Sequence, residues 1–323
     1  MSSTVIKTDS IPINNVVNLQ RAIPTSEIEV VQHPCQLTFK EDPNQIQDED
    51  EYQRSGTDAG LVVIFNQESY DSSRNIEKRV GTNTDVNELI LTFGRLGFNI
   101  ERQHIHNNLK RKEILEVINN LSKADYSDKN CLIVIMLTHG DEDNILETYD
   151  APISASEIWQ PFSNNSCQSF KNKPKFFIFQ ACKGHEYSRI DKIPENIIPR
   201  YIIRQSLEAD MLIAFSSVEN AKSCRNIVKG SWFIQELCRN FNAYGRRDDV
   251  VTLLLRVTKC VANGYYHLHE DDNSEKILGK QMPLFISTLS KKFYLTYSKD
   301  RKLLMYVKKQ QKLLTKTIKE LKL

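Results

Sequence analysis

Two residues of this chain, Cys182 and His139, could form a nucleophile and its base. Each ends a nearly continuous apolar run, Lys175–Phe179 in one case and Cys131–Leu137 in the other, and each lies close to a glycine. Such runs are typical of strands that are buried on both faces. In an open parallel sheet, reactive groups collect at the carboxyl ends of the strands. A thiol and an imidazole at two such ends could perform nucleophilic catalysis.

The spacing of the two residues fits one strand–helix–strand crossover. His139 precedes Cys182 by 43 residues, and a right-handed crossover can place two parallel strand ends near one another. Gly140 would let a substrate carbonyl approach the backbone, and its N–H with that of Cys182 could form an oxyanion hole. A single cysteine after a buried strand is more often structural, so the residues by themselves leave both interpretations open.

The elements that must position these residues alternate between strand and helix. This alternation predicts an α/β fold, with a mostly parallel sheet and helices on both faces. Besides the two apolar runs, we expect strands at 60–66, 98–102, 210–216 and 282–288. We expect helices at 84–96, 110–122, 230–241 and 248–262, and a short one around Ile158.

The composition excludes several classes of protein. The 43 basic and 41 acidic residues give no argument for binding nucleic acid. We expect no secretory signal in the first 24 residues, and no apolar run approaches the ~18 residues that cross a bilayer. The seven cysteines are an odd number without a C-x-x-C pair. This usage favours free thiols in a reducing compartment, and we expect a cytoplasmic protein.

Three segments lack the patterns of the central region. Residues 1–55 hold four basic and nine acidic residues and predict a flexible acidic leader. About 25 residues after Cys182 have no period, which is typical of a functional or disordered insert. The tail, 298–323, holds nine basic and two acidic residues. Its apolar residues have near-helical spacing, but we expect a solvated or loosely packed helix and no membrane contact. They are Leu303, Leu304, Val307, Leu314, Ile318 and Leu321.

Two histidine pairs, His104 with His106 and His267 with His269, could each place two imidazoles on one side of a strand, as a metal site requires. Only the acidic run after His269 lies at ligand spacing from either pair. We therefore expect exposed loop histidines, and neither a metal nor an organic cofactor.

At residues 180–184, Gln-Ala-Cys-Lys-Gly, the chain resembles the caspases, cysteine proteases that cut after aspartate. Their signature is Q-A-C-[RQG]-G with a histidine about 50 residues upstream, so Lys183 departs from it. The similarity runs from about Gly60 to Tyr297 and includes residues 79–82, Asn226, 230–233 and 281–283. It implies a caspase-like three-layer sandwich around a six-stranded, mostly parallel sheet.

The resemblance also assigns roles to residues. It implies that Cys182 is the nucleophile, His139 the general base and acid, and Gly140 a donor to the oxyanion. Arg79, Gln180 and Arg225 would hold the aspartate of the substrate. Two guanidinium groups and an amide can saturate a carboxylate with charge-assisted hydrogen bonds. Without the resemblance, both arginines would be interpreted as solvated surface residues.

The pocket for the residue two before the cut bond departs from the family. Lys222 and Cys224 stand where the family has aromatic residues, so the preference at that substrate position is expected to be broad or altered. Asn226 and Trp232 remain, which is compatible with an acidic or small residue four before the cut.

Family members are zymogens that are cut into a large and a small subunit. The resemblance implies a prodomain at 1–55, a large subunit at 56–191, a linker at 192–206, a small subunit at 207–297 and the tail at 298–323. Asp191 is the only aspartate between Cys182 and Asp210, so we expect processing there, with Asp48 and Asp50 as candidates for leader removal.

The short prodomain suggests an executioner type that acts in apoptosis as a homodimer across the edge at 282–288. An upstream initiator caspase and inhibitor-of-apoptosis proteins are the partners that the resemblance implies. Lys183, Lys222 and Cys224 motivate an alternative, in which a catalytically weak homologue regulates an active caspase by forming mixed dimers.

Overall fold

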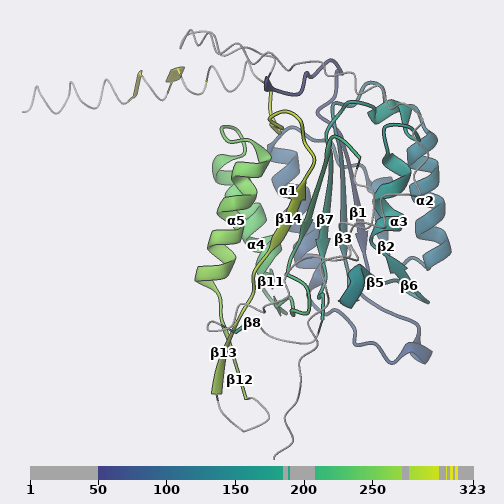
Figure 1. The fold of residues 1–323 in the computed structure, drawn as a ribbon, viewed down its shortest axis with the longest axis vertical. Coiled ribbons are helices and arrows are strands. Elements are labelled where there is room, and N and C mark those ends of the chain that lie inside the picture. The colour runs from purple at the N-terminus through teal and green to yellow at the C-terminus, as the bar shows by residue number, and fades with distance from the viewer. Residues whose placement is uncertain are drawn as a thin grey trace, which may run out of the picture. The chain divides into compact units, whose positions relative to one another are not determined.

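A six-stranded sheet lies at the centre of the fold (Figure 1). The structure, a computed structural model, describes residues 50–184, 188–189, 208–270, 276–297, 303, 306–307 and 310–311. The strand order is β14-β9-β7-β3-β1-β2; the first five strands along the chain are parallel, and β14 runs antiparallel to β9. The predicted six-stranded, mostly parallel sheet is therefore confirmed. Its strands are β1 (Leu61–Asn66), β2 (Ile105–Asn107), β3 (Leu132–Leu137), β7 (Lys175–Gln180), β9 (Met211–Phe215) and β14 (Leu284–Ser287).

Helices cover both faces of this sheet, as Figure 1 shows. All residues of β1, β3 and β7 are buried, because each strand sends alternate side chains into two separate cores. In β1, Val62 and Ile64 pack into the core on the side of α1, α4 and α5, whereas Val63 and Phe65 pack on the side of α2 and α3. The helices are α1 (Thr82–Arg95), α2 (Arg111–Lys123), α3 (Ser156–Trp159), α4 (Trp232–Tyr244) and α5 (Val250–Gly264).

The predicted strand at 98–102 is wrong. Phe98 follows Gly97, which has a φ of 93°, and its ring packs edge-on against Phe93 at 5.5 Å. This backbone turn ends α1, and the short edge strand β2 forms only at Ile105–Asn107. The alternation of apolar and polar residues after Gly97 imitates a strand without forming one.

His104 and His106 are half-buried on or beside β2, not exposed in a loop as expected. The ring of His106 stacks on that of Phe65 with centroids 5.1 Å apart. Within the described ranges, no group of three or more histidine, cysteine, aspartate or glutamate side chains is arranged to hold a metal.

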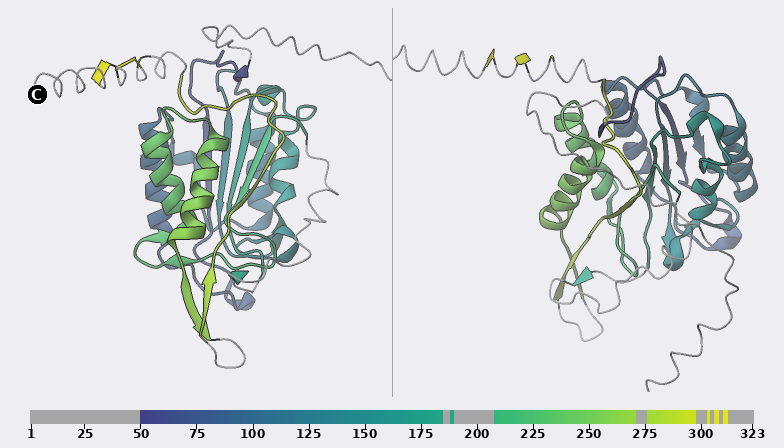
Figure 2. Two further views of the ribbon diagram at one scale, coloured as in Figure 1. Left: turned by 60° about the vertical axis from the view of Figure 1, so that its left-hand side comes forward. Right: turned by 45° about the horizontal axis from the view of Figure 1, so that its top comes forward.

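Short strands that the sequence pattern does not predict lie beyond the carboxyl ends of the parallel strands (Figures 1 and 2). They fasten the loops that surround those ends. One small sheet joins β4 (Gly140–Asp141), β5 (Ile145–Glu147) and β6 (Pro152–Ser154), and a second joins β10 (Arg225–Asn226) and β11 (Gly230–Ser231). The third joins β12 (His267–Glu270), β13 (Lys276–Lys280) and β8 (Ser188–Arg189).

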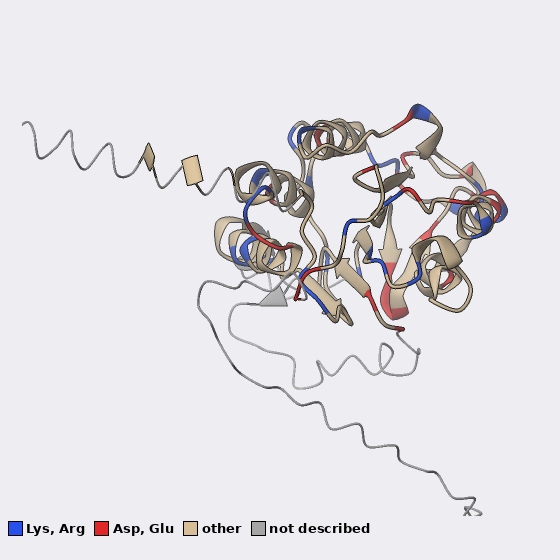
Figure 3. Cartoon of the chain, turned by 90° about the horizontal axis from the view of Figure 1, so that it is seen from above, with Lys and Arg blue, Asp and Glu red and all other residues tan. Residues whose placement is uncertain are grey.

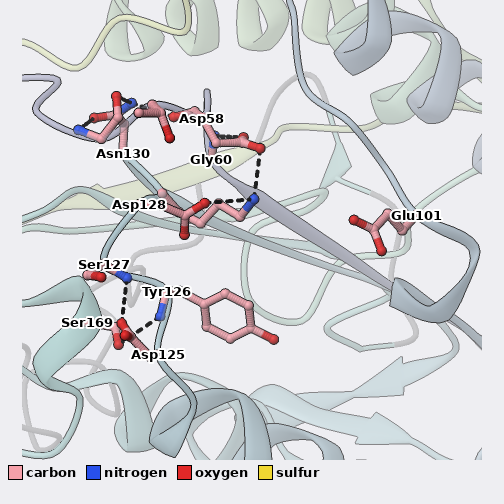
Figure 4. A network of polar contacts seen from close by, with 12 residues as sticks. Asp58, Gly60, Glu101, Asp125, Tyr126, Ser127, Asp128, Asn130 and Ser169 are labelled. Atoms are coloured by element: carbon pink, nitrogen blue, oxygen red, sulfur yellow. Dashed lines mark hydrogen bonds and ion pairs between the residues drawn. The ribbon is translucent and has the colours of Figure 1, made fainter.

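At the opposite end of the sheet lies a network of polar contacts that includes Asp58, Asp128 and Asn130 (Figure 4). Lys129 Nζ lies 2.7 Å from Asp58 Oδ2 and 3.4 Å from Asp128 Oδ2. Asn130 Oδ1 accepts from the backbone N–H of Gly56 at 2.8 Å, and its Nδ2 donates to the Gly56 carbonyl at 3.0 Å. These contacts tie the chain that enters β1 to the chain that enters β3. Viewed from this end, acidic and basic residues are interspersed (Figure 3).

Several segments singled out in the sequence lie outside the described residues. They include Asp48, Asp191, the whole linker at 192–206 and most of the tail. Residues 50–55, at the end of the predicted leader, are described and contact the folded domain: the Asp50 carbonyl accepts from the Lys292 N–H at 2.7 Å. Among the described helices, none has the length and apolar character needed to cross a membrane.

Candidate active site

Cys182 and His139 emerge from neighbouring strands at the same end of the sheet. The register of β3 and β7 sets Leu137 opposite Gln180, and the Thr138 N–H then donates to the Gln180 carbonyl at 3.0 Å. His139 and Cys182 each follow these paired positions by two residues, so they lie level with one another at the end of the sheet. The expected pairing of the two strand ends is present.

Gly140 lies directly against the backbone of Cys182. A Cβ atom at this position would meet the Cys182 carbonyl oxygen at 2.5 Å and the Ile145 carbonyl oxygen at 2.8 Å, and the Ala181 Cβ at 2.9 Å. Two of these neighbours are backbone atoms, so any side chain at residue 140 would push the two strand ends apart. Glycine is required here for close approach of the backbone, not for an unusual φ.

His139 is held as a neutral imidazole. Its Nε2 lies 2.9 Å from the carbonyl oxygen of Glu77, and a carbonyl can only accept, so Nε2 carries the proton and Nδ1 is left as the basic nitrogen. Burial and, to a smaller extent, the charges of Arg79 and Arg225 together lower the pKa of His139 to about 4, while the Glu77 carbonyl opposes them. The imidazole is therefore uncharged at neutral pH.

The sulfur of Cys182 contacts the loop that precedes β10. Its Sγ accepts from the Ser223 N–H at 3.3 Å and lies 3.7 Å from the Ser223 carbonyl oxygen. Cys182 is half-buried, whereas Cys131 and Cys238 are buried and burial raises the pKa of each to about 12. An accessible thiol with a backbone N–H donor suits a nucleophile, while the deeply buried thiols are inert.

Arg79 carries a buried guanidinium group that is only partly satisfied. The residue has no exposed surface, and its Nη1 donates to Thr82 Oγ1 at 2.7 Å and to the Gln67 carbonyl at 3.3 Å. Its Nε and Nη2 are also buried, and no hydrogen-bond partner for them exists among the described residues. Burial lowers the pKa of Arg79 to about 10, while the nearby Cys182 opposes this shift, so the group stays cationic at neutral pH.

Arg225 and Gln180 border the same region. Arg225 is half-buried in β10, its Nε donates to the Val80 carbonyl at 3.2 Å, and its charge lowers the pKa of both Arg79 and His139. Gln180 Nε2 donates to Ser223 Oγ at 2.7 Å. The three residues expected to bind a carboxylate thus lie around the thiol and the imidazole.

Residues expected to select other substrate positions lie around β10 and β11. Asn226 is exposed, and its Oδ1 accepts from the N–H groups of Val228 and Lys229, both at 2.9 Å, so it stabilises the turn between these strands. The ring of Trp232, at the start of α4, lies 5.1 Å from that of Tyr265.

Lys222 and Cys224, the two departures from the family in this region, are both half-buried. The Cys224 N–H donates to Gln281 Oε1 at 2.7 Å, and burial raises the pKa of the Cys224 thiol to about 12. Any effect of these residues on substrate preference stays a prediction.

Three residues that the sequence did not single out take part in the site. Tyr70 and Glu77 bind His139, and Ser223 binds both Cys182 and Gln180. They lie in irregular segments where no period or motif marks them, so only the folded chain identifies them.

Comparison with known proteins covers most of the chain. Residues 59–294, from just before β1 to beyond β14, match the family model described as "Caspase domain". Caspase-3 of Mesocricetus auratus is 33% identical over 246 residues, which cover 75% of this chain and 86% of the relative. Caspase-1 of Spodoptera frugiperda is 34% identical over 235 residues, covering 72% and 77%.

The fold is similar to that of a solved relative as well. The crystal structure of caspase-1 from Spodoptera frugiperda superposes with a TM-score of 0.67 at 31% sequence identity. The match covers 77% of this chain and 94% of that structure.

Proposed function

The chain belongs to the caspase family of cysteine peptidases, and on that premise we propose that it is an endopeptidase that cuts proteins after aspartate. The observation that carries the proposal is the buried guanidinium of Arg79. Two of its nitrogens have no hydrogen-bond partner among the described residues, beside a thiol and a neutral imidazole. Buried donors are rarely left without a partner, and a carboxylate matches the guanidinium fork.

The length of the bound side chain follows from the position of Arg79. Because the guanidinium is buried and fixed by Thr82, it cannot follow a ligand of different length. Aspartate would reach it with a short side chain, glutamate would be displaced by one methylene, and asparagine would lack the charge. A site built around buried polar groups rejects such analogues strongly.

The reaction would use the two strand ends in sequence. His139 Nδ1 takes the proton of Cys182, and the thiolate attacks the carbonyl carbon that follows the aspartate side chain. The N–H groups of Gly140 and Cys182 stabilise the oxyanion. The imidazolium then protonates the departing amine, and water, activated by the same nitrogen, hydrolyses the acyl-enzyme.

Maturation and assembly extend the proposal. The chain would be made as a zymogen, cut after Asp191 by an upstream protease, and act in apoptosis in the cytoplasm. The six described cysteines are free, which supports a reducing compartment. Homodimerisation would use the edge of β14, which pairs with β9 on one side and with no described strand on the other.

Peptide hydrolysis tests the proposal. The full chain, before and after cleavage between its subunits, is given matched fluorogenic peptides with aspartate, glutamate or asparagine before the cut bond. We expect kcat/KM for aspartate to exceed the other two by at least about 100-fold. Cys182→Ala should abolish turnover, and an aspartyl peptide aldehyde should bind wild type and not this variant.

A second pair of variants tests the pocket. Arg79→Lys keeps the charge but loses the fork, and we expect kcat/KM to fall by at least about 100-fold. Lys78→Arg changes the exposed neighbour and should leave it unchanged. Equal hydrolysis of the aspartate and glutamate peptides would overturn the proposal. Aldehyde binding without turnover would favour the catalytically weak regulator instead.

A further inference from the structure

The hydroxyl group of Tyr70 lies at a junction of hydrogen bonds beside His139. It accepts from the His139 backbone N–H at 3.1 Å and bonds to Thr138 Oγ1 at 3.0 Å. Thr138 Oγ1 donates its own proton to the Glu147 carbonyl at 2.5 Å. A hydroxyl has a single proton to give, so Tyr70 must be the donor in its bond to Thr138.

Neighbours other than Tyr70 bind the remaining polar groups of His139. The Glu147 N–H donates to the His139 carbonyl at 2.8 Å, and Nε2 bonds to the Glu77 carbonyl. The ring of Tyr70 lies 5.5 Å from the imidazole, tilted by 39°. The backbone N–H, the backbone carbonyl and Nε2 of His139 are thus all hydrogen-bonded to described residues. Nδ1 is the remaining polar atom, and it can accept a proton.

The same hydroxyl is connected to the carboxylate pocket. The Gln67 carbonyl oxygen, 3.3 Å from Tyr70 Oη, is a second and longer acceptor for the same Tyr70 proton, and it also accepts from Arg79 Nη1 at 3.3 Å. The charge of Arg79 acts on Tyr70, although burial is the larger effect and raises the pKa of the phenol. The hydroxyl therefore keeps its proton and can serve as donor and acceptor at once.

We propose that Tyr70 is a positioning residue, whose hydroxyl fixes His139 relative to both Cys182 and Arg79. The inference rests on the proposed peptidase function and adds a residue to its machinery. Phenylalanine at this position would keep the ring against the imidazole. It would leave the His139 N–H without its acceptor and break the link to Gln67. Catalytic geometry held to within a fraction of an ångström is sensitive to such a loss.

The test is Tyr70→Phe in the full chain, processed as wild type. We expect kcat to fall about 10-fold with KM within about twofold, because the hydroxyl contacts the base and not the substrate. Burial is the main cause of the low pKa of His139. A loosened, better hydrated imidazole should therefore have a higher pKa. The acidic limb of the pH–kcat/KM profile should move to higher pH.

A matched variant separates positioning from a general loss of stability. Tyr52→Phe also removes a partly buried hydroxyl, one that donates to Asp210 Oδ1 at 2.7 Å and accepts from the Ser290 N–H at 3.0 Å. This contact lies at the end of the sheet remote from Cys182. Tyr52→Phe should lower the melting temperature and leave kcat and the pH profile unchanged.

A titration that needs no turnover distinguishes this inference from the proposed function. In the Cys182→Ala background, NMR of the His139 ring should give a higher pKa with Tyr70→Phe than without it. If wild type cleaves no aspartyl peptide, the proposed function fails while this titration still tests Tyr70. An unchanged titration, or equal kinetic effects of Tyr70→Phe and Tyr52→Phe, overturns the role of Tyr70.

A second variant keeps the inference testable if Tyr70→Phe does not fold. Thr138→Val removes the acceptor of the Tyr70 proton but leaves the His139 N–H bonded to Tyr70. It should shift the pH profile in the same direction by a smaller amount, with Thr138→Ser close to wild type. A profile for Thr138→Val that coincides with that of wild type overturns the inference.

Discussion

The charge state of His139 depends on two arginines whose positive charges a substrate carboxylate would offset. Arg79 and Arg225 lower the pKa of His139 because a second positive charge nearby disfavours the imidazolium. A substrate carboxylate between the guanidinium groups would offset this effect and raise the pKa. We therefore expect the acidic limb of the pH–kcat profile, which reports the bound enzyme, to lie at higher pH than that of kcat/KM.

Steady-state kinetics between pH 4 and 8 with an aspartyl peptide measures both limbs. Titration of the peptide's own carboxyl group cannot place the kcat limb at higher pH than the kcat/KM limb. Binding to two guanidinium groups lowers the pKa of that carboxyl group instead of raising it. If the two limbs coincide, or if the kcat limb lies at the lower pH, the charges of Arg79 and Arg225 do not control the pKa of His139.

The sequence identifies single residues of the site unevenly. Cys182, His139 and Gly140 stand out because buried apolar runs deliver them to strand ends, which is a local pattern. The resemblance to a family marks Arg79 and Arg225, yet nothing in the irregular segment before α1 indicates that Arg79 is fully buried. Tyr70 contacts Thr138 and His139, which follow β3 about 70 residues further along the chain, and no local pattern encodes such a contact.

Helices and strands also differ in how far a local sequence pattern predicts them. The long strands and amphipathic helices are predictable because their own side chains show the period of burial. The short strands at the active-site end are not, since they hold two to five residues each and carry polar sequences such as His267–Glu270. These strands form because the loops around them are already placed, so their stability comes from tertiary contacts rather than from propensity.

Lys183, the departure from the family signature, joins three loops beyond the ends of the strands. Its ammonium is buried, lies 2.9 Å from Glu219 Oε2 and sits 3.9 Å from the centroid of the Phe215 ring. Glu219 Oε1 accepts from the Asp143 N–H at 2.9 Å. The loop after β9 is thereby bonded to the loop after β7 and to the segment that follows Gly140.

Glu219→Gln should destabilise the protein through Lys183. The amide can still accept from Asp143, but the buried ammonium loses its counter-ion, which we expect to cost about 2 kcal/mol in the free energy of unfolding. Urea denaturation measures this. Glu68→Gln, which removes a more exposed pair with Lys78 at 3.4 Å, should cost less than about 0.5 kcal/mol.

A double variant tests whether the loss of stability comes from the unpaired charge of Lys183. Lys183→Met combined with Glu219→Gln removes the buried charge with its partner and should recover part of the loss. If Glu219→Gln costs no more than Glu68→Gln, the ion pair does not hold the three loops together.

Residues 50–54, which we call the amino-terminal strap, lie against residues 292–297, the segment that precedes the tail. The Tyr52 N–H donates to the Lys292 carbonyl at 3.1 Å. Arg54 donates to the carbonyls of Tyr294 and Ala59, both at 3.0 Å, and its guanidinium lies 4.4 Å from the centroid of the Tyr297 ring. Cleavage after Asp191 would place the strap in one product and Lys292, Tyr294 and Tyr297 in the other.

The strap should therefore matter more after cleavage than before it. In the uncut chain, Arg54→Ala removes charge-assisted hydrogen bonds worth about 2 kcal/mol, but the covalent connection still keeps the two parts together. In the cut protein the same loss acts on the association of the two subunits, so the subunits should separate at a lower urea concentration than in cut wild type.

Size-exclusion chromatography in urea measures the separation, with the exposed Arg102→Ala as the control. Because the Asp50 carbonyl is bonded to Lys292, cleavage after Asp50 would also have to release the start of the strap. Cut Arg54→Ala that separates together with cut Arg102→Ala would show that the strap does not join the subunits.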